Sequence, residues 1–183
     1  MSHKTDLSQY NNSWYNPGAG ILVRMLWYIT QSCFFKSAYP FSGVRVFWLR
    51  FFGAKVGKGV VIKPHVRIKY PWRLRIGNHV WIGEGAWIDN LADVTIGDHS
   101  CVSQGAMLLT GNHDYSKSTF DLLVKAIVLE EGVWIGAQAL VAPGVVCKSH
   151  SVLSVKSVAV KDLDAYGIYR GNPAEKVKER VIG

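Results

Sequence analysis

The stretch RIGNHVWIGEGAWID, residues 75–89, places an aliphatic side chain at every sixth position. Ile76, Ile82 and Ile88 are these aliphatic residues, and a glycine follows each of the first two. A helix repeats every 3.6 residues and a strand every two, so neither explains the spacing. A period of six instead indicates a repeating unit made of one short strand and one tight corner.

The same spacing extends over most of the chain. The positions that continue it are Val56, Ile62, Ile68, Ile76, Ile82, Ile88, Ile96, Val102, Leu108, Leu129, Ile135, Val141, Cys147, Leu153 and Ala159. Three such units complete one triangular coil, and stacking the coils buries the aliphatic column between them. The pattern therefore predicts a solenoid of about five coils.

Composition and charge limit the classes of protein and of binding partner that fit this sequence. The 183 residues are 49% hydrophobic and only 19% charged, which excludes wholesale disorder. Three scattered cysteines are too few for a disulfide framework and favour the cytoplasm. Residues 1–75 hold twelve Lys and Arg against one acid, Asp6. Such a basic section can attract nucleic acid, an anionic membrane or a phosphorylated small molecule.

The two ends of the chain are expected to close the solenoid. The apolar stretch 21–35 contains Arg24 and is shorter than the about 20 residues that a membrane span needs. Residues 20–52 are therefore expected to form a helical cap. Near the other end, Asn172 followed by Pro173 and Glu175 has the pattern of a helix N-terminus and predicts a short helix.

The repeat and its expected caps divide the chain into three regions. Residues 1–52 form an N-terminal segment with the helical cap, and residues 166–183 form a C-terminal tail with the short helix. Between them, residues 53–165 form the solenoid, with a loop extruded at about 111–125. The spacing from Leu108 to Leu129 is too long for the repeat, which is why the loop is expected to protrude there.

The segments YPWRLRIGNHVWIGEGAWIDNLADVTIGDHSCVSQGAMLLTGNHDYS (70–116), VWIGAQALVAPGVV (133–146) and RGNPAEKVKERV (170–181) carry a resemblance. They resemble the hexapeptide-repeat acyltransferase family, and within it most nearly the colanic acid biosynthesis acetyltransferases. The resemblance implies an all-β fold, the left-handed parallel β-helix. It also implies an O-acetyltransferase that moves acetyl from acetyl-CoA to a hydroxyl of a saccharide or saccharide precursor, in exopolysaccharide biosynthesis.

His113 is the candidate catalytic residue. It lies at the root of the extruded loop, where a rigid scaffold can hold a functional group. Imidazole accepts protons near neutral pH, which suits removal of a proton from a hydroxyl that attacks a thioester. In the resemblance His113 occupies the place of the family's general base.

Further site residues are expected around His113. Asp89 and Asn90 lie a little more than one coil upstream and could bind the acceptor or orient the imidazole, and Asp114 and Tyr115 follow the histidine directly. Gly83 stands where the family's sugar acetyltransferases place an acceptor-binding asparagine, so their small-sugar acceptor cannot be transferred to this chain.

The resemblance also implies a cosubstrate groove and an assembly. Acetyl-CoA is expected along a groove between subunits of a homotrimer, with no metal required. The residues that match the groove are Trp134, Gly136, Ala137, Ala142, Val155 and Lys161. The acceptor is expected to be a small-molecule or lipid-linked saccharide. The basic section with residues 21–52 could also touch an anionic membrane, which would place the enzyme in the cytoplasm at the inner face of the membrane.

Three alternatives stay open. Acetyl could be transferred to an amino group, or another acyl group could be the cargo. A zinc lyase of the carbonic anhydrase type would need three metal-binding histidines, and beyond His79 and His113 the loop supplies no third. A scaffold or nucleic-acid binder would use the basic face, but no nucleic-acid-binding motif is present, so no nucleic-acid partner is expected.

Overall fold

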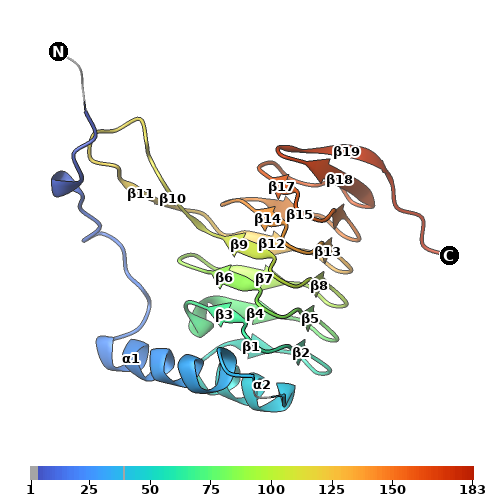
Figure 1. Ribbon diagram of the computed structural model, residues 1–183, viewed down its shortest axis with the longest axis horizontal. Coiled ribbons are helices and arrows are strands. Elements are labelled where there is room, and N and C mark those ends of the chain that lie inside the picture. Colours follow the sequence, from blue (N-terminus) through green and yellow to red (C-terminus); the bar gives the residue numbers. More distant parts are fainter. Residues whose placement is uncertain (1–3, 39) are drawn as a thin grey trace.

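The computed structural model describes residues 4–38 and 40–183, and its body is a left-handed parallel β-helix (Figure 1). Three parallel sheets form the walls of a triangular solenoid, with one strand of each coil in each wall. Two walls have five strands, and the other has a sixth parallel strand, so the chain makes five full coils and begins another. The predicted fold and coil number are confirmed.

Each wall collects strands that recur once per coil. The first wall contains β1 (Lys55–Val56), β4 (Leu74–Ile76), β7 (Val94–Ile96), β12 (Ile127–Leu129) and β15 (Val146–Cys147). The second wall contains β2 (Val61–Ile62), β5 (Trp81–Ile82), β8 (Cys101–Val102), β13 (Trp134–Ile135), β16 (Val152–Leu153) and β18 (Gly167–Gly171). The third wall contains β3 (Arg67–Ile68), β6 (Trp87–Asp89), β9 (Met107–Leu109), β14 (Leu140–Val141) and β17 (Val158–Ala159).

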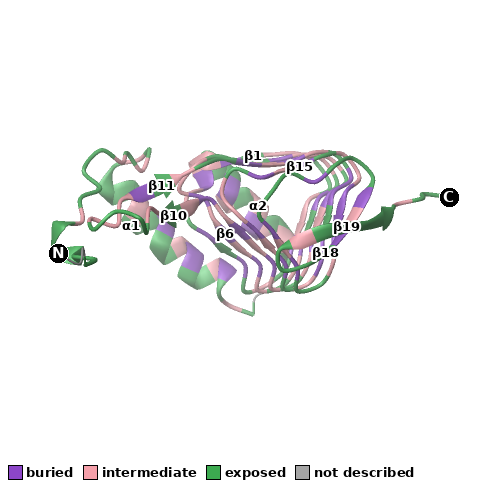
Figure 2. Cartoon of the chain, turned by 90° about the horizontal axis from the view of Figure 1, so that it is seen from above, coloured by how far each residue is buried: buried purple, intermediate pink, exposed green. Residues whose placement is uncertain are grey.

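The period-six aliphatic residues form the core. In the second wall Ile62 pairs beside Ile82, and the column continues through Val102, Ile135 and Leu153, all with no exposed surface. Neighbouring strands lie about 4.8 Å apart, so each side chain packs directly on the one below it. Seen from above, the buried residues line the inside of the coils (Figure 2).

The corners need backbone conformations that most residues avoid. Histidines occupy four of the corners with positive φ, namely His65, His79, His99 and His150, at 61°, 55°, 56° and 59°. The first three are exposed, as the repeat predicts, and His79 stacks on His99 with ring centroids 5.3 Å apart. These histidines therefore serve the turns of the solenoid.

Helices cover the open end of the first coil, as expected. α1 (Ile21–Thr30) continues into a π-helical turn, Gln31–Phe35, and α2 (Ser42–Phe51) follows. Trp27 Nε1 donates to the Ile68 carbonyl at 2.9 Å, and the Gln31 side chain accepts from the Ile68 amide at 2.6 Å. The cap thus satisfies backbone groups of β3 that would otherwise lack partners. Within the described residues, no helix is both long and apolar enough to cross a bilayer.

The expected C-terminal helix is wrong. Residues Ala174–Glu179 form strand β19, which pairs antiparallel with β18, and Asn172 and Pro173 lie in the turn between the two strands. β18 is the last parallel strand of its wall, so its free edge offers a row of hydrogen-bonding groups. A returning strand satisfies that edge, whereas a helix could not. Arg180 then secures the tail by donating to the carbonyls of Gly132 and His150 at 2.9 and 3.1 Å.

The residues at 111–125 leave the solenoid as an antiparallel hairpin. β10 (Gly111–His113) pairs with β11 (Leu122–Val124), so that His113 lies opposite Leu122. Figure 1 shows this hairpin projecting from the solenoid toward the N-terminal segment. The hairpin gives His113 a regular backbone position beyond the wall.

Candidate active site

His113 is held between two aromatic rings at the end of β10. Its ring stacks on Phe120 with centroids 4.3 Å apart and planes 7° from parallel. The Tyr10 ring contacts it from the N-terminal segment at 5.7 Å. The imidazole is therefore fixed in orientation by packing as well as by hydrogen bonding.

The hydrogen bond to Phe120 determines which ring nitrogen is free. His113 Nδ1 lies 2.9 Å from the Phe120 carbonyl oxygen, which can only accept. Nδ1 must therefore carry the hydrogen, and Nε2 of the neutral ring keeps its lone pair. Phe120 has a φ of 52°, a left-handed conformation that turns its carbonyl toward the imidazole. This arrangement prepares His113 to accept a proton at Nε2.

The imidazole lines a polar cleft of about 560 Å³. The other lining residues are Tyr10, Asn12, Ser13, Tyr15, Pro17, Arg24, Lys69, Tyr70, Leu91 and Leu122. Tyr70 and Leu91 follow β3 and β6 at the same corner of neighbouring coils, so the cleft runs along one edge of the solenoid. The rest of the wall is the N-terminal segment and the start of α1.

Four hydrogen bonds hold the N-terminal segment over this edge, one of them donated by the Arg73 guanidinium to the Asn16 carbonyl at 2.5 Å. The Asp6 amide donates to the Ser118 carbonyl at 2.8 Å. The Tyr15 hydroxyl donates to the Leu91 carbonyl, and Trp72 Nε1 donates to the Pro17 carbonyl, both at 2.7 Å. Sequence reasoning missed this wall, although the polar and aromatic run SQYNNSWYN (8–16) is the composition of a ligand-contacting segment.

Asp89 and Asn90 lie outside the set of residues that line this cleft. Lys69 Nζ lies 3.1 Å from Asp89 Oδ1. Asn90 is fully buried, and its amide donates to the Tyr70 carbonyl at 2.6 Å and accepts from the Tyr70 N–H at 3.0 Å. In the described part of the chain, neither residue bonds to His113, and both connect neighbouring coils.

Asp114 and Tyr115 also point elsewhere. The Asp114 carboxylate accepts from the hydroxyl and the amide of Ser116, and these hydrogen bonds lower its pKa. The Tyr115 side chain is 83% exposed. Among the residues that the structure describes, the hydrogen-bond partner of the His113 ring is Phe120.

A second groove, of about 590 Å³, gathers most of the residues expected to bind the cosubstrate. Trp134, Gly136, Ala137 and Val155 line it, together with Arg170 and Arg180, which sequence reasoning missed. Ala142 and the exposed Lys161 are outside it. A Cβ on Gly136 would lie 2.7 Å from the Leu153 carbonyl oxygen, so the close stacking of coils requires glycine there.

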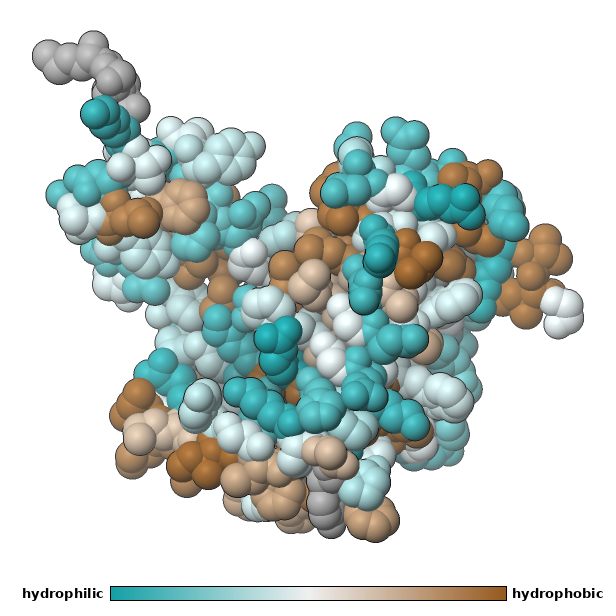
Figure 3. Space-filling model, in the orientation of Figure 1, coloured by the Kyte–Doolittle hydropathy of each residue, from teal (hydrophilic) through white to brown (hydrophobic). Residues whose placement is uncertain are grey.

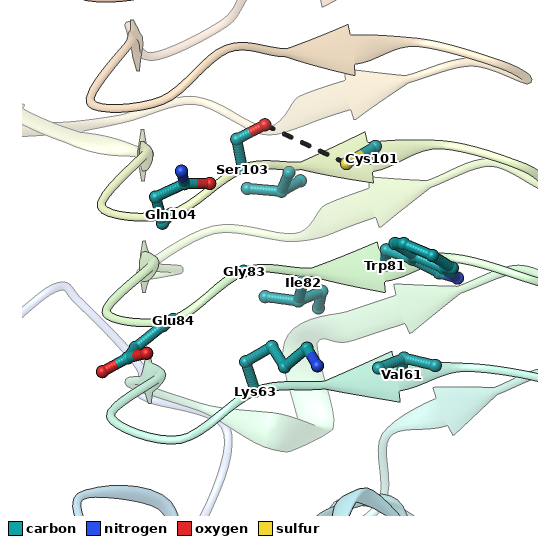
Figure 4. A pocket seen from close by; sticks show the side chains of 10 residues that line it. Val61, Lys63, Trp81, Ile82, Gly83, Glu84, Cys101, Ser103 and Gln104 are labelled. Carbon is teal, nitrogen blue, oxygen red and sulfur yellow. Dashed lines mark hydrogen bonds between the residues drawn. The ribbon is translucent and has the colours of Figure 1, made fainter.

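The groove continues downward along the second wall. Ser103 and Gln104 border both this groove and a neighbouring cleft of about 410 Å³ that also includes Trp81 and Gly83 (Figure 4). A Cβ on Gly83 would lie 2.4 Å from the Gln104 amide nitrogen. Packing between coils therefore accounts for the glycine at this position.

Two of the three cysteines, Cys101 and Cys147, do not have the properties of nucleophiles. Burial raises the pKa of the Cys101 thiol, and it raises that of Cys147 to about 12. A thiol must ionise to attack a thioester, so burial makes both residues poor nucleophiles near neutral pH. Across residues 4–38 and 40–183, no three His, Cys, Asp or Glu side chains gather as a metal site.

The two grooves lie at different corners of the triangle. Ser103, Gly136 and Val155 follow strands of the second wall, whereas His113 follows β9 at the far end of the third wall. The third wall therefore separates the second groove from His113 of the same chain. The fold and these two grooves define the class of hexapeptide-repeat acyltransferases.

Comparison with known proteins agrees with this class. The chain is 40% identical over 164 residues to the Escherichia coli (strain K12) protein assigned as colanic acid biosynthesis acetyltransferase WcaF, covering 90% of each chain. It is 26% identical to the galactoside O-acetyltransferase of the same organism, covering 69% of this chain and 64% of that one. No protein-family model matches the chain.

Solved structures share the fold. A hexapeptide-repeat-containing acetyltransferase from Vibrio cholerae O1 biovar eltor, determined with acetyl coenzyme A, superposes with a TM-score of 0.80. It is 23% identical, and the match covers 88% of each chain. The chain belongs to the hexapeptide-repeat acetyltransferase family, and it is an acetyl-CoA-dependent acetyltransferase.

Proposed function

We propose that this enzyme transfers the acetyl group of acetyl-CoA to a hydroxyl of a saccharide or saccharide precursor in exopolysaccharide biosynthesis, with His113 as the general base. The observation that carries the proposal is the His113 imidazole, whose Nδ1 is engaged by Phe120 while Nε2 is left free in a polar cleft. The relative WcaF is assigned to the biosynthesis of a polysaccharide, colanic acid, which supports this class of acceptor.

The reaction is a direct transfer. Nε2 of His113 removes the proton of the acceptor hydroxyl as its oxygen bonds to the thioester carbonyl carbon. The carbon–sulfur bond then breaks, and the CoA thiolate leaves with the proton from the imidazolium. No covalent acyl-enzyme forms in this scheme, in keeping with the raised pKa values of Cys101 and Cys147.

Acetyl-CoA occupies the groove of the second wall in this proposal. The flat, small-residue surface around Gly136 and Ala137 lets the pantetheine approach the backbone, and Trp134 and Val155 flank it. Arg170 at the groove, and Lys161 beyond it, are the candidates for the CoA phosphates. Ala142 stays a predicted contact.

A homotrimer completes the active site. His113 and the groove lie at different corners of one chain, so a thioester can meet an imidazole only when the groove of one subunit faces the hairpin of the next. A cyclic arrangement of three subunits closes such head-to-tail contacts without leaving free ends. The separation of the two grooves supports this assembly.

The acceptor enters the cleft beside the N-terminal segment. Tyr10, Asn12 and Tyr15 present aromatic faces and hydrogen-bonding groups, which suit a saccharide ring and its hydroxyls. The acceptor-binding roles of Asp89, Asn90, Asp114 and Tyr115 stay predictions. The acceptor is a small-molecule or lipid-linked saccharide, and the three free cysteines suit a cytoplasmic location.

Release of the CoA thiol, measured with a panel of saccharide acceptors, tests the proposal. His113→Ala should lower kcat by about 10² to 10⁴, while acetyl-CoA still binds. His99→Asn is the control, because His99 is an exposed corner residue whose positive φ asparagine tolerates. Equal kcat for the wild type and His113→Ala would remove His113 from the mechanism, and turnover only with amino sugars would indicate N-acetylation.

A further inference from the structure

The N-terminal cap exposes a large apolar face. On α1 the exposed residues are Ile21, Leu22, Val23, Met25, Leu26, Tyr28 and Ile29, and Phe41, Phe47 and Phe51 extend the face along α2. Trp27 is the buried residue of α1. Figure 3 shows brown side chains along the lower edge of the molecule, where Figure 1 places the two helices. Soluble monomers rarely expose contiguous apolar patches of this kind without a binding role.

Cations without an acidic partner are frequent on the cap and on the first two coils. Within the described residues, the cations of the cap and first two coils that have no acid within ion-pair distance are Arg24, Lys36, Arg50, Lys55, Lys58, Lys63, Arg67 and Arg75. The one acid of residues 1–75, Asp6, is bonded to Ser118 of the hairpin, at the opposite end of the N-terminal segment from α1. The apolar face is thus bordered by positive charge.

Arg24 connects the apolar face to the His113 cleft. It lines the cleft, and it also lines a shallow groove of about 250 Å³ with Ile21, Met25, Tyr28 and Ile29. Its buried Nε has no hydrogen-bond partner among the described residues. Lys69 lies across the same cleft. A guanidinium in this position can bind a phosphate whose apolar substituent lies on α1.

Arg24 and His113 lie at levels of the solenoid that are two coils apart. α1 packs on the first coil through Trp27 and Ile68, whereas His113 follows the third coil. Two steps of strand spacing correspond to about 10 Å along the solenoid axis. A phosphate at Arg24 would therefore place an attached short saccharide along the cleft toward Nε2.

We propose that the apolar face of α1 and α2 docks on an anionic lipid bilayer, and that Arg24 binds the phosphate of a lipid-linked saccharide acceptor. The docking is independent of the proposed function, whereas the role of Arg24 rests on it. α1 has ten residues and is too short to span a bilayer core of about 30 Å, so it lies in the interface.

The charges favour a membrane over a second copy of the chain. Two identical faces brought together would place their unpaired cations side by side, which disfavours association. Anionic lipid headgroups neutralise the same cations, at about 1 kcal/mol for each Lys or Arg near the surface. The apolar side chains then enter the region between headgroups and acyl chains.

Cosedimentation of the full chain with vesicles tests the docking. The wild type should bind vesicles that contain phosphatidylglycerol, should bind vesicles of phosphatidylcholine alone far less, and should dissociate as salt rises. Leu22→Glu combined with Leu26→Glu should weaken binding at least about tenfold. The matched control is Val177→Glu with Val181→Glu, which changes two exposed valines at the opposite end of the chain and should leave binding unchanged.

Three results would overturn the docking. The first is equal binding of the wild type to both kinds of vesicle, and the second is equal binding of the double α1 variant and the wild type to anionic vesicles. The third is a lower mass in solution for the double α1 variant, which would assign the face to contacts between copies. Circular dichroism and acetyl-CoA binding show that each variant is folded. Vesicle binding needs no acetyl-CoA. A variant that loses vesicle binding can therefore still be tested for acetyl-CoA binding, and the reverse also holds.

A second set of vesicles tests whether Arg24 binds the phosphate of a lipid-linked acceptor. At matched total charge, the wild type should prefer vesicles that contain a polyprenyl phosphate over vesicles of phosphatidylglycerol, and Arg24→Gln should remove this preference. Absence of a preference in the wild type would overturn the phosphate site. If glucose 1-phosphate binds in solution with the same dependence on Arg24, the phosphate belongs to a soluble acceptor and the lipid-linked acceptor is wrong.

Discussion

His113 Nδ1 lies 2.9 Å from the carbonyl oxygen of Phe120, and the two rings stack 4.3 Å apart. One residue thus sets both the tautomer and the plane of the candidate base. The hairpin makes this possible because β10 and β11 bring His113 beside Leu122 and the residues that precede it.

The tautomer can be observed directly. In ¹⁵N-labelled protein with a neutral His113 imidazole, Nδ1 should carry the proton and Nε2 should be unprotonated, because the Phe120 carbonyl can only accept. Nuclear magnetic resonance of the imidazole nitrogens measures this. The spectrum of His113→Asn assigns the signals, and a proton on Nε2 would show that the carbonyl does not orient the ring.

Tyr15 is predicted to hold the acceptor cleft in shape. Burial raises its pKa to about 12, so at neutral pH the hydroxyl is protonated and donates to the Leu91 carbonyl. Tyr15→Phe removes this hydrogen bond, worth about 0.5 to 1.5 kcal/mol, and should lower kcat/KM for the acceptor by roughly two- to tenfold.

Acetyl-CoA affinity should not change in Tyr15→Phe, because Tyr15 is not part of the cosubstrate groove. Tyr166→Phe, at an exposed corner, is the control and should leave both parameters unchanged. A Tyr15→Phe enzyme with wild-type kcat/KM would show that the N-terminal segment does not shape the cleft.

Gly136 is predicted to be required for both packing and cosubstrate binding. In Gly136→Ala the new methyl group would lie 2.7 Å from the Leu153 carbonyl oxygen and from the Val155 amide nitrogen, so two coils must separate. Overpacking of this kind destabilises by about 1 to 3 kcal/mol. Urea denaturation measures the loss, and titration with CoA should show weakened binding.

The matched control for Gly136→Ala is Gly43→Ala. Gly43 lies in α2, and a Cβ there would meet no atom within 4 Å. Alanine is the better helix former by about 1 kcal/mol, so this variant should be as stable as the wild type or more so. Equal stability of Gly136→Ala and the wild type would contradict the tight stacking at the groove.

Asp98 is predicted to make stability depend on acid pH. Hydrogen bonds from the Asn78 side chain and backbone, at 3.0 and 2.7 Å, hold the pKa of Asp98 below its ordinary value of 3.8. A lowered folded-state pKa adds stability above the unfolded-state pKa, and this stability is lost as pH falls through the folded-state pKa.

The stability difference between the wild type and Asp98→Asn should therefore be full at pH 7 and should shrink below about pH 4. Urea unfolding at a series of pH values measures it. Asp93→Asn, which leaves the Asn78 contacts intact, is the control. A difference that is constant from pH 7 to the acid range would mean that the charge of Asp98 contributes nothing.

The solenoid could be predicted because the aliphatic spacing that determines it lies within each six-residue unit and recurs along the chain. Each aliphatic residue from Val56 to Ala159 faces the same direction once per unit, so the pattern determines the core and the walls. His113 stood out for the same reason, since it lies where the repeat is interrupted.

The contacts of His113 could not be predicted because they join segments far apart in the sequence. Tyr10 reaches His113 across about a hundred residues, and no period signals such a contact. The Asn172–Glu175 pattern misled for a related reason. A local cap signal was outweighed by the free edge of β18, which the sequence alone does not reveal.

Calorimetric titration of the purified protein with acetyl-CoA and CoA, with its mass in solution measured alongside, is the most direct test of a cosubstrate site shared between subunits. We expect a trimer that binds one molecule of either ligand per chain, because each groove is completed by a neighbouring hairpin. A folded protein that binds neither ligand, or a monomer that binds with full affinity, would contradict a cosubstrate site shared between subunits.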